Sequence, residues 1–235
     1  MGRRLPPSII VLSPGCLSRG AVGSPEAEAL GSFPRLAREV LSAGARGLLL
    51  REPALEDGAF LDLALELRAL MDRECPEAWL GLHDRVHLAA AAGADAVHLA
   101  GHSLDAEAAR GVVGEELAIG VSTHAGDGEP RWKGADFALH APVFEPNSKH
   151  VQAPVLGPEG LRDFCGVCSL PVWALGGVEP GVIASLAGTG AVGAAAIGAV
   201  WDEGAAPTEP GLRARVEGLV AAGEAVFGAV PGARS

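Results

Sequence analysis

The stretch GLLLREPA (residues 47–54) places three leucines directly before an arginine, a glutamate and a proline. A continuous apolar run, rather than an alternating one, is typical of a strand in a parallel sheet that helices cover. Proline donates no hydrogen bond to a strand ladder, so it is expected only where the strand has ended. The stretch therefore predicts a buried strand over 47–50, with Arg51 as the first polar residue beyond it.

The same arrangement recurs along the chain. Further short apolar runs, each followed by a loop and a segment that suits a helix, lie at residues 8–13, 78–82, 95–99, 117–122, 136–141, 171–176 and 193–198. The clearest helical periodicity covers residues 57–72. Eight strand–helix units predict an α/β fold, a closed (β/α)8 or TIM barrel. An open doubly wound sheet is the alternative, but no G-x-G-x-x-G fingerprint follows the first strand.

The chain is expected to form a single domain over residues 1–235, since its length suits one α/β barrel and no low-complexity linker divides it. A C-terminal helix and a loose tail are expected after residue 201. The phrases SAGARG, AAGADAVHL and AGTGAVGAA each place a helix-ending glycine before the next strand, which indicates repeated units.

Charge and hydropathy exclude several classes of function. The net charge of −11 argues against binding to nucleic acid or to anionic membranes. No segment approaches the roughly 20 apolar residues that a membrane helix needs, and the start of the chain lacks a signal-peptide cleavage pattern. We therefore expect a cytoplasmic location and no membrane. Cys165 and Cys168 have C-x-x-C spacing but no second pair, which favours packing over a metal or redox role.

Polar residues follow most of the predicted strands. Because ligands of a TIM barrel bind at the carboxyl ends of its strands, these residues should share one rim. They are Arg51, Glu52, His83, Asp84, His98, Ser122, Thr123, His124, Asn147, Ser148 and Lys149. His124 can move a proton near neutral pH, or it orders its loop. Asp84 binds a ligand, caps a helix or pairs with Arg85.

Glycines end the last two predicted strands. LGGVEPG (175–181) places Gly176 and Gly177 before a helix start, where bare backbone N–H groups can hold a phosphate. AIGAV (196–200) offers Ile197 and Gly198 as the second half of the same cradle. The alternative is a tight turn that simply requires glycine.

Five segments together resemble the thiamine phosphate synthase and TenI (thiazole tautomerase) superfamily, over about residues 8–201. The segments are LLLREP, GLHDRVHLAAAAGADAVHLAG, AIGVSTH, DFALHAPVFEPNSK and LPVWALGGVEP. The resemblance implies a (β/α)8 barrel, in agreement with the strand count. It also implies the chemistry of the synthases, which join a pyrimidine pyrophosphate to a thiazole phosphate and release pyrophosphate with the help of magnesium.

The chain departs from the synthase pattern in one half of the site. The family's Gln-x-Arg-x-Lys after the second strand becomes Leu49, Arg51 and Pro53. Asp84 resembles the first magnesium ligand, but Ser103 stands where a second aspartate is expected.

Further departures follow along the chain. Asp105, two residues beyond Ser103, is a possible substitute for the second aspartate. After the sixth strand, Ser148 and Lys149 match the Thr-Lys pair that the family uses for pyrophosphate, and Pro146 replaces a threonine.

These losses spare the phosphate cradle and so favour the tautomerase branch. The expected protein binds a phosphorylated thiazole with the help of Ser122 and Thr123, moves a proton with His124 and supports the substrate with Arg51. It needs no cofactor. A magnesium-dependent synthase that uses Asp84, and a non-catalytic or repurposed barrel, are the alternatives. A homo-oligomer is left open, and the histidines at 83, 98, 102 and 140 fit neither branch.

Overall fold

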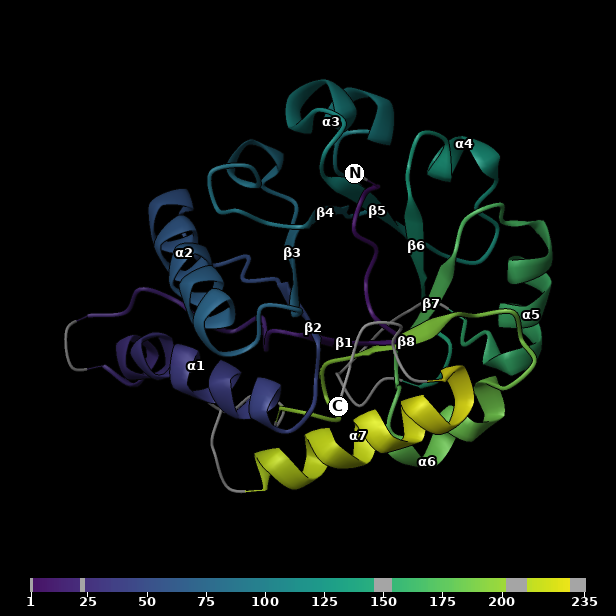
Figure 1. The fold of residues 1–235 in the computed structure, drawn as a ribbon. Helices are drawn as coiled ribbons and strands as arrows, with labels where there is room; N and C mark the ends of the chain where they lie inside the picture. Colours follow the sequence, from purple (N-terminus) through teal and green to yellow (C-terminus); the bar gives the residue numbers. More distant parts are fainter. Residues whose placement is uncertain (1, 22–23, 146–153, 202–210, 229–235) are drawn as a thin grey trace.

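The computed structural model describes residues 2–21, 24–145, 154–201 and 211–228, in which eight parallel strands close into a barrel in sequence order (Figure 1). They are β1 (Ile9–Leu12), β2 (Gly47–Leu50), β3 (Trp79–His83), β4 (Ala96–Leu99), β5 (Ala118–Thr123), β6 (Phe137–His140), β7 (Val172–Leu175) and β8 (Gly193–Ala196). Pairing of β1 with β8 closes the ring. The predicted TIM barrel is confirmed, and each predicted strand overlaps an observed one.

Helices surround the barrel (Figure 1). They are α1 (Pro25–Ser42), α2 (Asp57–Glu74), α3 (Ala106–Val113), α4 (Glu129–Trp132), α5 (Gly157–Val167), α6 (Pro180–Ile183) and α7 (Leu212–Phe227), with 3-10 turns η1 (Val86–Leu88) and η2 (Ala184–Leu186). The helix predicted at 57–72 is α2, and α7 is the helix expected after residue 201. Only η1 and further turns link β3 to β4, because the short segment between them leaves no room for a long helix. The expected tail at 229–235 lies outside the described residues.

Aromatic rings fill the interior of the barrel. Trp79 and Trp173 each meet Phe137 edge to face, with ring centroids 6.1 and 5.7 Å apart. Small residues on neighbouring strands make room for these rings. A Cβ atom on Gly120 would lie 2.2 Å from the Phe137 ring, and one on Gly193 would lie 2.3 Å from that of Trp173. The interior is therefore a packed core and not a channel.

The N-terminal segment crosses the amino-terminal ends of the strands, where Figure 1 shows it as a purple trace. The buried indole N–H of Trp79 donates to the carbonyl of Arg4 (3.1 Å), and that of Trp173 donates to the carbonyl of Pro7 (2.8 Å). The Arg3 guanidinium reaches Glu115 and Asp136. This end of the barrel is thus closed by the chain itself, which leaves the opposite rim for ligands.

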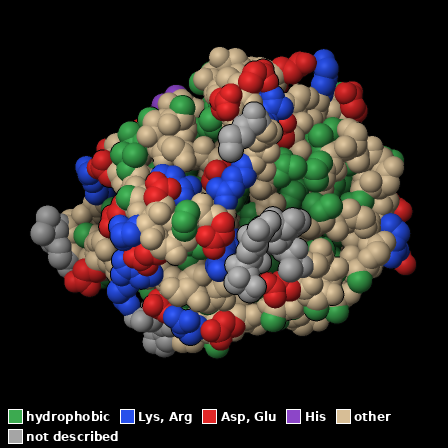
Figure 2. Space-filling view, viewed as in Figure 1, with side chains coloured by type: hydrophobic (Ala, Val, Ile, Leu, Met, Phe, Trp, Pro, Cys, Tyr) green, Lys and Arg blue, Asp and Glu red, His purple; other side chains and the backbone are tan. Residues whose placement is uncertain are grey.

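Acidic and basic side chains are interspersed on the face that Figure 2 shows. None of the helices in the described part of the chain combines the length and the apolar character that crossing a bilayer requires.

Two aspartates play the same role at the amino-terminal ends of β4 and β6, where the sequence repeats Gly-Ala-Asp. Asp95 accepts a hydrogen bond from the backbone N–H of Leu80 (2.8 Å), and Asp136 accepts one from that of Ile119 (2.8 Å). Asp136 also accepts from Arg110 at 2.6 Å and from Arg3 at 2.9 Å. Each aspartate therefore ties its own strand to the preceding one.

Asp136→Asn should lower the free energy of unfolding by about 1–3 kcal/mol, because an amide cannot accept all of these bonds and leaves a buried donor unpaired. Urea unfolding measures the difference. Asp163→Asn, an exposed position on α5, is the matched control and should stay within about 0.5 kcal/mol of the parent. Equal stability of the two variants would contradict the assigned role of Asp136.

Candidate functional site

The carboxyl ends of the strands form the mouth of the barrel, which is the candidate site. Residues at the strand ends that continue the inward-facing positions are Arg51, His83, His98, Ser122 and Ile197. His83 and His98 lie with ring centroids 5.7 Å apart, and His98 packs on the Phe137 ring at 6.0 Å. The aromatic core thus forms the floor of the mouth, and the chemistry-bearing side chains lie above it.

Glu52 holds the β1–α1 loop against the mouth. Its carboxylate is fully buried and accepts hydrogen bonds from the backbone N–H groups of Gly15 (2.9 Å) and Leu17 (2.8 Å). Burial raises the pKa of this carboxyl, and a hydrogen bond from Ser13 acts against the shift. The Ser13 hydroxyl also accepts from the backbone N–H of Arg51 at 2.8 Å. The adjacent Arg51 is therefore placed by a rigid, buried network.

Asp84 adopts a left-handed backbone conformation (φ 61°), the only such non-glycine residue among those described. Its backbone N–H donates to the carbonyl of His98 (2.8 Å), and its Oδ1 atom accepts from the backbone N–H of Ala100 (3.3 Å) and from the Ser103 hydroxyl. Its Oδ2 atom lies 3.4 Å from Nδ1 of His83. Burial lowers the pKa of His83 to about 4, so this neighbour is neutral. The structure holds a strained residue firmly at the mouth, a feature that is common at functional sites.

Ser122 is fixed at both ends. Its hydroxyl lies 2.9 Å from Nε2 of His98, and its carbonyl accepts from Nε of Arg131 (2.8 Å). Arg131 also donates to the carbonyls of Leu99 and Ala100, which joins the ends of β4 and β5. His98 is 2% exposed, and burial lowers its pKa well below the usual value. A neutral imidazole and a half-buried hydroxyl therefore face the mouth together.

The other residues predicted around β5 separate. Thr123 is buried, donates to the carbonyl of Leu139 (3.3 Å) and lies 2.9 Å from Nδ1 of His140. His140 stacks on Phe164 of α5 with ring centroids 3.7 Å apart, so this pair faces the helical layer. His124 is exposed at the rim, with its Nδ1 atom 3.7 Å from Oδ2 of Asp127. The structure thus brings Ser122, but not Thr123, into the mouth.

The glycines after β7 pack against the loop after β6. Gly176 and Gly177 have φ values of 91° and 62°, and a Cβ atom on either would clash with the backbone of residues 142–145. Both the tight turn and the close approach therefore require glycine. Ile197 is half-buried beside the interior core and Gly198 is exposed in the following turn. Ser148 and Lys149 lie outside the described residues.

Several residues of this arrangement escape sequence reasoning. Arg131 lies in a short helix that the hydrophobic pattern of the sequence does not predict, and Ser103 stands out in the sequence only as a departure from the family pattern.

Asp105, the possible substitute for the missing aspartate, instead caps α3 by accepting a hydrogen bond from the backbone N–H of Ala108 (2.7 Å). Among the described residues no group of three or more His, Cys, Asp or Glu side chains is arranged to hold a metal ion. Asp84 is thus a lone carboxylate.

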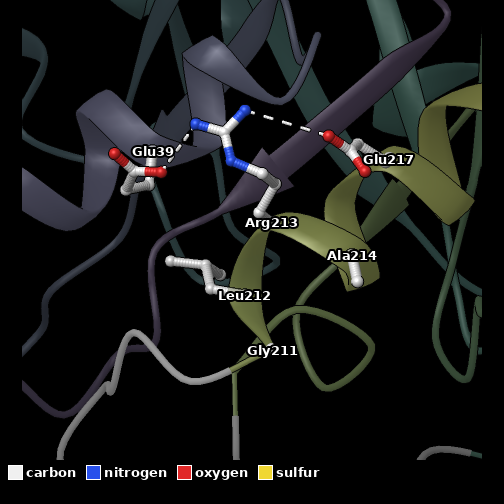
Figure 3. Close-up of a pocket in the computed structure, with 6 residues that line it drawn as sticks. All are labelled: Glu39, Gly211, Leu212, Arg213, Ala214 and Glu217. Carbon is white, nitrogen blue, oxygen red and sulfur yellow. Dashed lines mark hydrogen bonds and ion pairs between the residues drawn. The ribbon is translucent and has the colours of Figure 1, made fainter.

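A hollow of about 370 Å³ lies away from the mouth, between α1 and the start of α7 (Figure 3). Arg213 spans it and pairs with Glu39 at 2.8 Å and with Glu217 at 3.8 Å. Because its cation is already paired with two carboxylates, the hollow offers little to an anionic ligand.

Because His140 is buried, we expect the free energy of unfolding to decrease in acid. Burial lowers its pKa in the fold from 6.5 to about 4. Between pH 6.5 and pH 4 the His140 imidazole binds a proton in the unfolded chain but stays neutral in the folded chain. The free energy of unfolding is therefore highest above pH 6.5 and decreases towards pH 4. The parent should therefore lose about 2–3 kcal/mol more than His140→Gln between pH 7 and pH 4, measured by urea unfolding. His102→Gln, an exposed control, should follow the parent; if His140→Gln follows it too, the assignment is wrong.

Comparisons with known proteins agree with the barrel fold. A family model described as thiamine monophosphate synthase (TMP-TENI) matches residues 21–200. A putative thiamine-phosphate synthase of Geobacter sulfurreducens is 38% identical over 162 residues, covering 68% of this chain and 75% of that protein. The thiamine biosynthesis bifunctional protein ThiM/ThiE of Symbiobacterium thermophilum is 36% identical over 79% of this chain, which spans only 40% of that protein.

Among solved structures, thiamine phosphate pyrophosphorylase from Pyrococcus furiosus superposes with a TM-score of 0.75 at 27% identity, covering 94% of this chain and 97% of that one. The family model and the curated relatives each span well over half of the chain. This protein therefore belongs to the thiamine monophosphate synthase and TenI family.

Proposed function

We propose that this protein is a thiamine-phosphate synthase, a transferase that joins a pyrimidine pyrophosphate to a thiazole phosphate and releases pyrophosphate. Relatives named as synthases favour this reaction over the tautomerase that the substitutions alone favoured. The observation that carries the proposal is Asp84, a carboxylate held at the mouth in a strained conformation by three hydrogen bonds. A tautomerase would have no use for an anion fixed there.

The residues at Asp84 fit a magnesium ion only in part. Magnesium keeps several of its waters and binds through one or two carboxylates together with substrate phosphates. Oδ1 of Asp84 is engaged by Ser103 and Ala100, while Oδ2 faces the neutral His83. One carboxylate with one open oxygen suits an ion that arrives with pyrophosphate, rather than an ion held by the protein alone. When bound there, magnesium would neutralise charge on the departing pyrophosphate.

The chain's own residues support departure of an anion. Arg51 supplies a permanent positive charge beside the mouth, placed by the Ser13 and Glu52 network. Ser122 presents a hydroxyl that can hydrogen-bond an anionic oxygen. The turn at Gly176 and Gly177 supplies bare backbone at the opposite side of the barrel, where the thiazole phosphate would bind. The neutral His83 and His98 line the space between without adding charge.

Asp84→Asn should abolish magnesium-dependent turnover, by at least about a hundredfold in kcat/KM, since the one carboxylate of the site becomes neutral. Formation of thiamine phosphate from the two substrates measures it. Asp72→Asn, on the outer face of α2, is the control and should keep full activity. An Asp84→Asn variant as active as the parent would overturn the role of this carboxylate.

Ser103→Asp should lower the magnesium concentration needed for half-maximal turnover, because it supplies a second carboxylate beside Asp84. The titration is run on the same assay. An unchanged requirement would show that the ion is not shared between these two positions.

A thiazole tautomerase is the second candidate, and the observation that favours it is an exposed imidazole at the rim, His124, with a carboxylate nearby. In that reaction the exposed His124 would carry the proton, with Asp127 beside it. Metal-independent aromatisation, followed by ultraviolet absorbance, should then fall about a hundredfold or more in His124→Ala and stay unchanged in His102→Ala. The tautomerase is excluded if the parent forms thiamine phosphate readily and His124→Ala forms it at the same rate. Thermal stabilisation by a thiazole phosphate without either reaction would indicate a binding protein.

A further inference from the structure

We propose that His98 is a positioning residue, whose Nε2–H donates to Ser122 and thereby aims the Ser122 hydroxyl proton at an anionic oxygen of a pyrophosphate or phosphate group in the mouth. The proposal rests on the proposed function only for the identity of the anion. The juxtaposition that carries it is a 2.9 Å contact between Nε2 of His98 and Oγ of Ser122, below an open rim.

The other ring nitrogen of His98 determines which way this hydrogen bond runs. Nδ1 is buried and has no hydrogen-bond partner among the residues that the structure describes. It faces Gly120, on which a Cβ atom would lie only 2.7 Å away, so this neighbour carries no side chain that could pair with it. A buried N–H without a partner is rarer in proteins than a buried lone pair without one. The proton of the neutral ring is therefore placed on Nε2, and Ser122 accepts.

This assignment leaves the Ser122 hydroxyl with its own proton free to donate. A hydroxyl has one O–H and two lone pairs, and one lone pair is used by His98. The position of the residue is fixed as well, because Arg131 binds its carbonyl at 2.8 Å. Ser122 is half-buried, so its free side is reached from the mouth. A hydroxyl oriented in this way is a preorganised donor for a negatively charged oxygen.

The binding test uses inorganic pyrophosphate with the full-length chain, measured by titration calorimetry with and without magnesium. Ser122→Ala and His98→Asn should each weaken binding about tenfold, since each removes one oriented donor to a charged oxygen. The double variant should be no weaker than either single variant, because both substitutions remove the same interaction. Additive losses would overturn the proposal, and so would a parent that does not bind pyrophosphate.

A matched pair of variants separates positioning from packing. In His98→Gln the side-chain amide can place an N–H near the position of Nε2, whereas in His98→Asn it is too short to do so. Binding should therefore be restored to within about threefold of the parent in His98→Gln alone. If the two amides behave alike, the ring acts only by filling space and the proposal is wrong.

The tautomer is tested directly on the parent protein, which covers the case in which a variant fails to fold. Nitrogen-15 NMR of histidine-labelled protein should show His98 protonated at Nε2 and bare at Nδ1. Protonation at Nδ1 would overturn the proposal. Turnover is measured in parallel. A parent that binds pyrophosphate with the predicted coupling but makes no thiamine phosphate refutes the proposed synthase activity and leaves the role of His98 intact.

Discussion

The rings of Trp79, Phe137 and Trp173 fill the barrel interior and occupy space that side chains on the inward-facing glycines would otherwise need. The closed amino-terminal end of the barrel and the mouth at its other end both depend on this packing. Below the rings, two indole N–H groups need partners, and the N-terminal segment provides them while it closes that end. Above, the Phe137 ring supports His98 and so sets the depth at which the mouth begins. Both the interior core and the floor of the mouth require glycine at position 120, since a Cβ atom there would clash with Phe137 and with His98.

Among the described residues, the mouth that results is rich in neutral donors and poor in carboxylates. Burial keeps His83 and His98 uncharged, so within the described part of the mouth Arg51 and the backbone carry the positive potential. Ser103 donates to Asp84 where a second carboxylate would repel it, which explains how a single carboxylate remains tightly held. If the proposed synthase activity holds, magnesium would need further ligands from the substrate, because no group of three or more His, Cys, Asp or Glu side chains among the described residues is arranged to hold it.

The substitutions and the overall similarity of the chain point in different directions. Pro53, exposed in the turn after β2, stands where the synthase pattern has a lysine, yet the match to synthases covers most of the chain. The substitution concerns one half of the site, whereas the match concerns most of the barrel. Loss of a flexible surface lysine weakens binding of an anion without altering the barrel that places Arg51 and Asp84. The architecture is therefore compatible with a synthase of reduced charge as well as with a changed reaction.

The barrel and the position of its polar rim can be predicted from the pattern of residues along the chain. Continuous apolar runs predict parallel strands whichever residues pack between them, and strand ends predict where polar side chains meet. Which of those side chains act together cannot be read from that pattern, because contacts between strands depend on register and on side-chain direction. Alternation turns Ser122 into the mouth and its neighbour Thr123 towards α5. Glu52 and Arg131 gained their roles in the same way, since each binds backbone atoms that lie far from it along the chain and close to it in the fold.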